Sequence, residues 1–164
     1  MSGTEIDGLR KLRTGSLITI IGPILIMVGA FIGLFSALGG AATGTMSGAA
    51  VGAVTGLAII AIAAIVGIVM ELYAVYLMRQ GFGILKTYDN QFGIGGTGAL
   101  LILVASILLI LAYIALLNPL ALFFLLFLAI PAGLLYFIGI IMMGIGFHRV
   151  GSKYDDSLVS VGGI

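Results

Sequence analysis

Four long apolar runs constrain the fold of this chain more than any other feature. They cover residues 16–38, 48–78, 99–117 and 120–147, and Glu71 is the only charged side chain in them. About 20 consecutive apolar residues are enough for a helix to cross the hydrocarbon core of a bilayer. Because a backbone in lipid must satisfy its hydrogen bonds internally, we predict that each run is a transmembrane helix.

The composition supports the same fold class. Hydrophobic residues make up 62% of the 164 residues and charged residues only 8%, whereas about a quarter of the residues of a soluble domain are charged. The length fits a single membrane domain with little chain outside the lipid bilayer. We therefore predict an all-α membrane protein, a bundle of four transmembrane helices formed by two antiparallel hairpins.

Residues typical of turns separate the runs. Gly39–Ser47, rich in Gly, Ala and Thr, predicts a short turn that contains Gly40 and Gly44, and Asn118–Pro119 predicts a tight turn between the last two helices. Gln80–Gly98 is predicted to be the longest polar connection. Residues 157–162 echo residues 16–22, over too short a length to count as a repeat. We expect residues 157–164 either to dock on the bundle or to begin a further apolar segment of a longer chain.

The basic residues are sorted along the chain. All seven Lys and Arg lie before the first run, between the second and third runs, or after the fourth. Four spans place these three segments on one side of the membrane, and the positive-inside rule makes that side cytoplasmic. The sequence thus predicts a multi-pass protein of the cell membrane with both termini in the cytoplasm.

Glycines recur at every fourth residue from Gly40 to Gly56. On a helix this spacing forms a face without side chains, which lets another helix approach closely. The predicted helix-packing residues are Gly29, Gly33, Gly48, Gly52 and Gly56. Two alternatives remain open: the face packs on the first helix of the same chain, or it meets a second copy or another subunit.

Glu71 is the candidate intramembrane ionisable site. Such a carboxylate serves either a proton or cation path or a structural pairing with a nearby base. The structural alternative is favoured, because Glu71 lies about two turns from Arg79 and close to the predicted membrane interface. The residues predicted at that interface are Tyr73, Tyr76, Arg79, His148 and Arg149.

Other residue patterns do not predict chemistry. The chain has one His and no Cys, which is too few for a usual metal site. Gly93, Gly95 and Gly98 spell G-x-G-x-x-G, but no strand precedes them and no acidic residue follows at the required distance. Adjacent Asp155 and Asp156 would diverge on a helix. We expect no catalytic residues, no metal, no cofactor and no nucleic-acid partner.

Two segments carry a resemblance to a known family. They are Glu5–Leu17 (EIDGLRKLRTGSL) and Gly144–Tyr154 (GIGFHRVGSKY). They resemble the ends of an archaeal family of uncharacterised multi-pass membrane proteins, a domain of unknown function found in thermoacidophilic archaea. The resemblance implies an archaeal membrane as the source and implies no activity.

The leading functional expectation is structural. We expect an accessory or structural membrane protein, not an enzyme, that packs through small-residue faces into a homo-oligomer or a larger complex with other membrane subunits. One alternative is a small transporter or channel that uses Glu71 and the glycine-rich stretch 93–98. Another alternative is a coat protein of a vesicle or virion.

Overall fold

The computed structural model describes residues 2–115 and 122–155, with side chains described for residues 2–111 and 127–155. This part of the chain contains no strand, and its elements are α1 (Gly3–Ala42), α2 (Met46–Lys86), the 3-10 helix η1 (Asn90–Phe92), α3 (Gly93–Ala115) and α4 (Leu122–Tyr154). All four α-helices are long and apolar enough to cross a membrane. The predicted fold class is therefore confirmed. Three predictions lie outside the described residues: the Asn118–Pro119 turn, the place of Asp156 and the segment 157–164.

The chain divides into two compact units, with boundaries inside α1 and α2. The hairpin unit is Ser16–Ala74 and consists of the middle of α1 and the first part of α2. The α3–α4 unit combines Met1–Gly15 with Val75–Ile164, so it holds the beginning of α1, the end of α2, η1, α3 and α4. Each unit has its own close contacts between helices.

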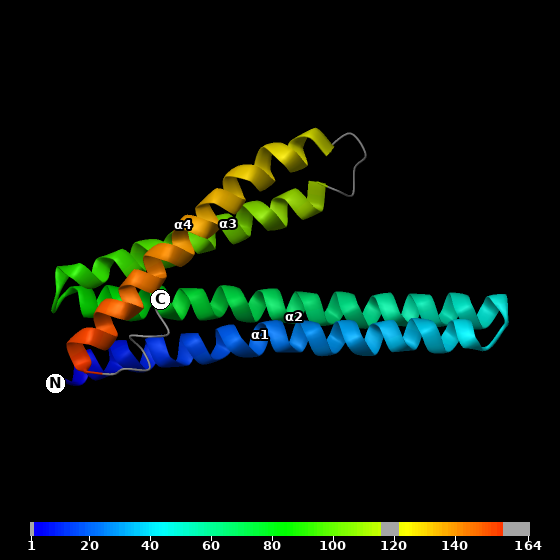
Figure 1. The fold of residues 1–164 in the computed structure, drawn as a ribbon, viewed down its shortest axis with the longest axis horizontal. Coiled ribbons are helices and arrows are strands. Elements are labelled where there is room, and N and C mark those ends of the chain that lie inside the picture. The colour runs from blue at the N-terminus through cyan, green and yellow to red at the C-terminus, as the bar shows by residue number, and fades with distance from the viewer. Residues whose placement is uncertain (1, 116–121, 156–164) are drawn as a thin grey trace. The chain divides into compact units, whose positions relative to one another are not determined.

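Glycine contacts hold the hairpin unit together, and α1 and α2 run side by side in opposite directions (Figure 1). A Cβ added at Gly33 would lie 2.5 Å from the carbonyl oxygen of Gly56, and one added at Gly52 would lie 2.6 Å from Cα of Gly40. A Cβ added at Gly29 would overlap the Cβ of Ala63. No side chain larger than hydrogen fits at these crossings, so the glycine face of α2 packs on α1 of the same chain.

The turn between α1 and α2 is shorter than predicted. Only residues 43–45 leave the helices, so Gly40 lies in α1, and its predicted place in the turn is wrong. Gly44 takes the left-handed φ of 69° that favours glycine. The Thr45 hydroxyl oxygen accepts a hydrogen bond of 3.0 Å from the amide of Gly48, which caps α2. This cap lets α2 begin at once, and Gly48 consequently faces the threonines of the turn.

The α3–α4 unit uses the same kind of contact. A Cβ added at Gly98 of α3 would lie 2.6 Å from the carbonyl oxygen of Gly139 of α4. Near the beginning of α3, the buried ring of Phe82 from α2 fills the space left by Gly95 and Gly146. The Phe82 ring also packs edge-on against Phe147 at 5.2 Å between centroids. These contacts join the end of α2 to the α3–α4 pair.

The predicted polar connection from Gln80 to Gly98 is wrong over most of its length. Helix α2 continues to Lys86 and α3 begins at Gly93. Phe82 and Leu85 are fully buried, so packing extends the helix through a stretch whose glycines disfavour it. Close packing requires glycine at position 81, because an added Cβ would lie 2.8 Å from the carbonyl oxygen of Gly8.

The helices are longer than the predicted spans. Helices α1 and α2 contain 40 and 41 residues, which at about 1.5 Å per residue is close to twice the thickness of the hydrocarbon core. In α1 the charged side chains lie before Gly15. In α2 they lie from Glu71 to Lys86. The predicted spans are therefore parts of longer helices, and the limits of the membrane-spanning parts stay a prediction.

The glycine contacts predict a selective cost of adding a methyl group. Gly52→Ala should destabilise the hairpin unit by about 1–3 kcal/mol, since the new Cβ overlaps backbone that cannot rotate away. Thermal unfolding of the purified protein in detergent, followed by circular dichroism, measures the change. Gly39→Ala is the matched control, because Gly39 lies in α1 with nothing within 4 Å of an added Cβ. Equal stability of the two variants would contradict the packing role of Gly52.

Candidate functional site

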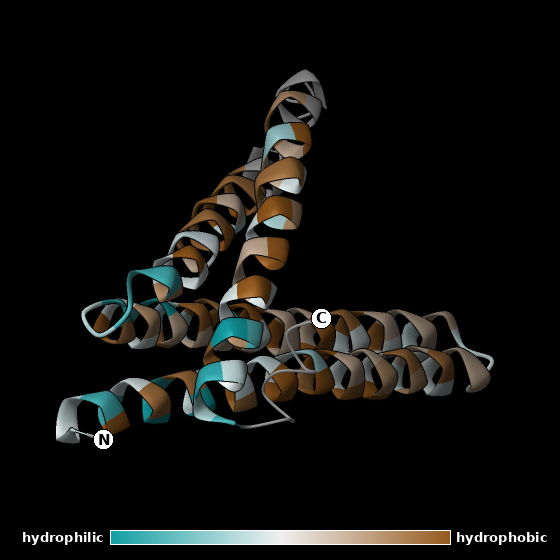
Figure 2. Cartoon of the chain, turned by 60° about the vertical axis from the view of Figure 1, so that its left-hand side comes forward, coloured by the Kyte–Doolittle hydropathy of each residue, from teal (hydrophilic) through white to brown (hydrophobic). Residues whose placement is uncertain are grey.

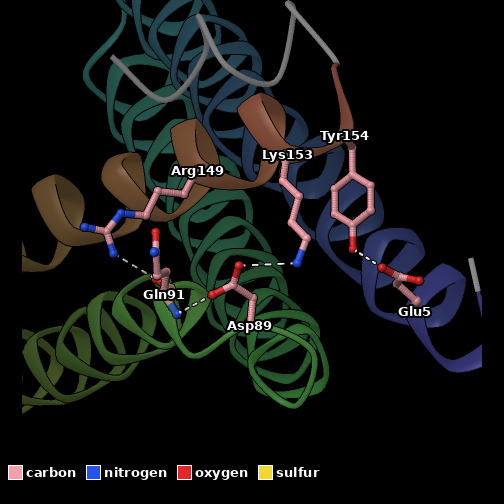
Figure 3. A network of polar contacts seen from close by, with 6 residues as sticks. All are labelled: Glu5, Asp89, Gln91, Arg149, Lys153 and Tyr154. Atoms are coloured by element: carbon pink, nitrogen blue, oxygen red, sulfur yellow. Dashed lines mark hydrogen bonds and ion pairs between the residues drawn. The ribbon is translucent and has the colours of Figure 1, made fainter.

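Hydrophilic residues of the α3–α4 unit occur at the beginning of α1, in the connection around η1 and at the end of α4 (Figure 2). We call the residues that bind one another there the polar cluster. Its members are Glu5, Asp89, Gln91, Arg149, Lys153 and Tyr154 (Figure 3). They come from three segments that are far apart in the sequence, so the cluster is a product of the fold.

The beginning of α1 forms a reciprocal cap. The Ser2 hydroxyl oxygen accepts a hydrogen bond from the amide of Glu5 at 3.3 Å, and the Glu5 carboxylate accepts one from the amide of Ser2 at 3.2 Å. This arrangement satisfies two amides that a helix start leaves without partners. The Ser2 hydroxyl also lies 2.7 Å from the Tyr88 hydroxyl of the connection. The cap therefore fixes Glu5 where other segments can reach it.

Asp89 organises the connection between α2 and α3. It has an extended backbone (φ −154°, ψ 116°), and its Oδ1 accepts a hydrogen bond of 3.0 Å from the amide of Gln91, which caps η1. Its Oδ2 lies 3.3 Å from Nζ of Lys153 in an ion pair. The Gln91 amide is the main cause that holds the pKa of Asp89 below its ordinary value, with Lys153 adding to the effect and desolvation opposing it.

The last turns of α4 supply the other half of the cluster. Arg149 donates a hydrogen bond of 3.1 Å from Nη1 to the carbonyl oxygen of Gln91. The Tyr154 hydroxyl donates a hydrogen bond to Oε1 of Glu5 (Figure 3). Together with the Lys153 ion pair, these contacts tie the end of α4 to the connection and to the beginning of α1.

An aromatic side chain lies beneath these polar contacts. Phe92 is 1% exposed, and its ring stacks on that of Tyr154 at 6.4 Å between centroids. Nζ of Lys153 lies 5.1 Å from the centroid of the Phe92 ring, within the range of a cation–π contact. Lys153 is therefore held from two sides, by the carboxylate of Asp89 and by the ring.

The contacts of the polar cluster join the beginning of α1, the connection around η1 and the end of α4. Each of its carboxylates already accepts hydrogen bonds from groups of the same chain. Its strongest contacts are charge-assisted, but they are exposed or only partly buried, so each stabilises the fold only modestly. What the cluster supplies is a fixed arrangement of three segments at one end of the α3–α4 unit.

Comparison with known proteins finds a family for this chain and no individual relative. A family model described as a protein of unknown function (DUF973) matches residues 5–164. The chain belongs to this family. No curated protein and no solved structure matches the chain.

Membership in the DUF973 family agrees with the uncharacterised family expected from the two end segments. Its archaeal source stays a prediction. The matched range includes every residue of the polar cluster from Glu5 to Tyr154.

The structure places the predicted interface residues of this DUF973 chain in different ways. Arg149 belongs to the polar cluster, whereas Tyr76, Arg79 and His148 are exposed in the same unit. Tyr73 is exposed on α2 in the hairpin unit. Only one of the five predicted interface residues is thus part of the cluster.

Glu71 lies on α2 in the hairpin unit and is half-buried. Its role stays a prediction. Asp155 is exposed just after α4 with a left-handed φ of 54°. Gly93, Gly95 and Gly98 all lie in the first turns of α3, so their spacing belongs to a helix and not to a phosphate-binding loop.

The sequence interpretation missed most of the cluster. The spacing of Ser2 and Glu5 is that of a capping box and could have been found. The place of Asp89 two residues before Gln91 is a weaker signal of the same kind. Nothing local indicates that Tyr154 binds Glu5, since 149 residues separate them.

The Asp89 contacts predict a specific pH dependence. Because the folded-state pKa is lowered, the carboxylate stabilises the fold above its ordinary pKa of 3.8, and this contribution is lost as the pH falls through the lower folded value. The amide of Gln91 should report the transition in an NMR titration with a midpoint below 3.8, the ordinary value.

Asp89→Asn should abolish that titration, because asparagine keeps an oxygen for the Gln91 amide but carries no charge. Asp155→Asn removes a carboxylate from the same unit outside the cluster, and it should leave the titration unchanged. A Gln91 titration with a midpoint at or above the ordinary value would show that the cap does not form in solution.

Proposed function

We propose that this protein is a structural or accessory subunit of the cell membrane that assembles with copies of itself or with other membrane subunits. The observation that carries the proposal is the nature of the buried side chains. Among the described side chains every buried one is apolar, with none polar or charged. Between the described helices, glycines allow backbones to approach closely. Such spans are suited to packing, whereas a path for ions or polar substrates needs polar groups along it.

The glycine faces are used within the chain, so assembly has to use another surface. The large apolar side chains that α1 turns outward, among them Phe31 and Phe35 at 64% and 58% exposed, are available for lipid or for a second protein. Contacts of large side chains with a neighbouring helix are favourable in lipid only where the shapes fit closely. The proposed partner surface is therefore outside the glycine face of Gly48, Gly52 and Gly56.

Assembly can be measured directly. After extraction with a gentle detergent, the protein should elute with a protein mass above the 16.9 kDa of one chain, or with other membrane proteins bound, when mass is determined by light scattering. A single chain without bound protein across detergents and concentrations would contradict the proposal. Liposomes containing the protein supply the test of the rival: a proton or ion flux that Glu71→Gln abolishes and Glu71→Asp retains would make it a transporter.

We also infer that both termini face the cytoplasm, because all seven Lys and Arg lie before the first apolar run, between the second and third, or after the fourth. The chain has no Cys, so single introduced cysteines report the topology. Met46 is 93% exposed beside the turn between α1 and α2, and Thr87 is exposed in the connection after α2. Each is replaced by cysteine in a separate variant. A membrane-impermeant thiol reagent should label Met46→Cys in intact cells and Thr87→Cys only after lysis. The reverse pattern would invert the orientation.

A further inference from the structure

The polar cluster leaves an excess of positive charge on the α3–α4 unit. Within this unit Glu5 binds Tyr154, Asp7 lies 3.7 Å from Lys11, and Asp89 pairs with Lys153. These carboxylates are therefore engaged with neighbours at fixed positions. The unit contains all seven Lys and Arg of the chain and five of its six Asp and Glu, so basic residues are in excess.

Five basic side chains form no ion pair with a carboxylate among residues 2–115 and 122–155. One is Arg149, which donates to the carbonyl oxygen of Gln91. The other four are exposed, and they are Arg10, Arg13, Arg79 and Lys86. Arg10 and Arg13 lie on α1, and Arg79 and Lys86 lie on α2. A basic residue without a carboxylate neighbour keeps its full attraction for an external anion.

The two basic residues of α2 share one face with two other residues. A spacing of seven residues returns to the same side of a helix, so Arg79 and Lys86 point in similar directions. Gly83 lies between them and is exposed, with nothing within 4 Å of an added Cβ, and Tyr76 precedes them at 46% exposure. We call Tyr76, Arg79, Gly83 and Lys86 the basic stripe.

The rest of the unit holds the basic stripe in place. On the other side of the same turns of α2, Met78, Phe82 and Leu85 are buried, so the helix cannot rotate to hide the stripe. The methylenes of Lys86 lie along Gly93, where an added Cβ would be 3.0 Å from Cδ. The Lys86 stem is thus packed while its side chain stays exposed.

We propose that the basic stripe binds the phosphate groups of anionic lipids. It follows directly on the apolar part of α2, and it pairs basic residues with an exposed tyrosine, the combination typical of the headgroup level of a membrane. Gly83 leaves a gap without a side chain between the two charges, into which a headgroup can approach. Each basic residue near an anionic surface strengthens binding about fivefold. The proposal needs only that the chain spans a bilayer, and not the accessory role proposed above.

Native mass spectrometry of the full chain in detergent tests the proposal, with phosphatidylglycerol and phosphatidylcholine added as probes. The unmodified protein should retain more phosphatidylglycerol. Arg79→Gln with Lys86→Gln should reduce that preference by about fivefold for each side chain replaced. Inorganic phosphate in excess should compete weakly, because it lacks the acyl chains that hold a lipid beside the stripe.

Arg10→Gln with Arg13→Gln is the matched control, since it removes the same two positive charges from exposed positions of the same unit. This control should retain the preference for phosphatidylglycerol. Equal losses in the two double variants would mean that net charge alone attracts the lipid, and no loss in the stripe variant would place the lipid elsewhere. Full competition by inorganic phosphate would mean that the stripe is a site for free anions. Each of these three results would overturn the proposal.

A reporter in the stripe gives a second measurement in a bilayer. The chain contains no Trp, so Gly83→Trp introduces a single fluorophore at a position with open space. Phosphatidylglycerol brominated near its headgroup should quench it more strongly than phosphatidylcholine labelled in the same way. Phe137→Trp on α4, where Phe137 is 65% exposed and apolar side chains surround it in sequence, should be quenched equally by both lipids. Equal quenching at Gly83→Trp would contradict the proposal.

Discussion

The fold depends on how helices attract one another where water is absent. Lipid offers no hydrogen bonds to the backbone, so each span must be a helix, and lipid tails are as apolar as leucine, so helices associate mainly by close contact. This chain meets that requirement with glycine in both of its units. Gly33 and Gly56 allow the close approach in the hairpin unit, and Gly98 and Gly139 allow it in the α3–α4 unit.

The glycine faces pack against each other within one chain, and this removes them as an argument for assembly with a second chain. A run of glycines at every fourth residue is longer than one brief helix crossing needs, which made a second copy an equal alternative. In the structure α1 and α2 stay side by side over the hairpin unit, so contacts continue from Gly22 and Gly67 to Gly40 and Gly52. The length of the glycine series is explained by the length of this contact, and it no longer argues for a partner.

Local sequence indicated the elements well and their ends poorly. The apolar runs predict four helices because the hydrophobicity that identifies a membrane-spanning helix can be read from the local sequence. The ends depend on packing: Gly81 and Gly83 argue against a helix, yet the burial of Phe82 and Leu85 extends α2 to Lys86. The polar cluster was beyond prediction for a similar reason. The Glu5–Tyr154 hydrogen bond and the Asp89–Lys153 ion pair exist only once α4 returns to the beginning of α1.

The polar cluster and the basic stripe have a common cause. The carboxylates are held at helix caps, while basic residues of α2 stay exposed. A carboxylate that caps a helix, as Glu5 and Asp89 do, accepts hydrogen bonds from backbone amides and is fixed beside them. It cannot then move to neutralise an arginine elsewhere on the surface. The caps therefore stabilise the ends of helices and, by the same contacts, leave the exposed face of α2 positive. Removing a cap would free a carboxylate as well as weaken a helix end, so the positive surface depends on the fold and not only on the count of charged residues.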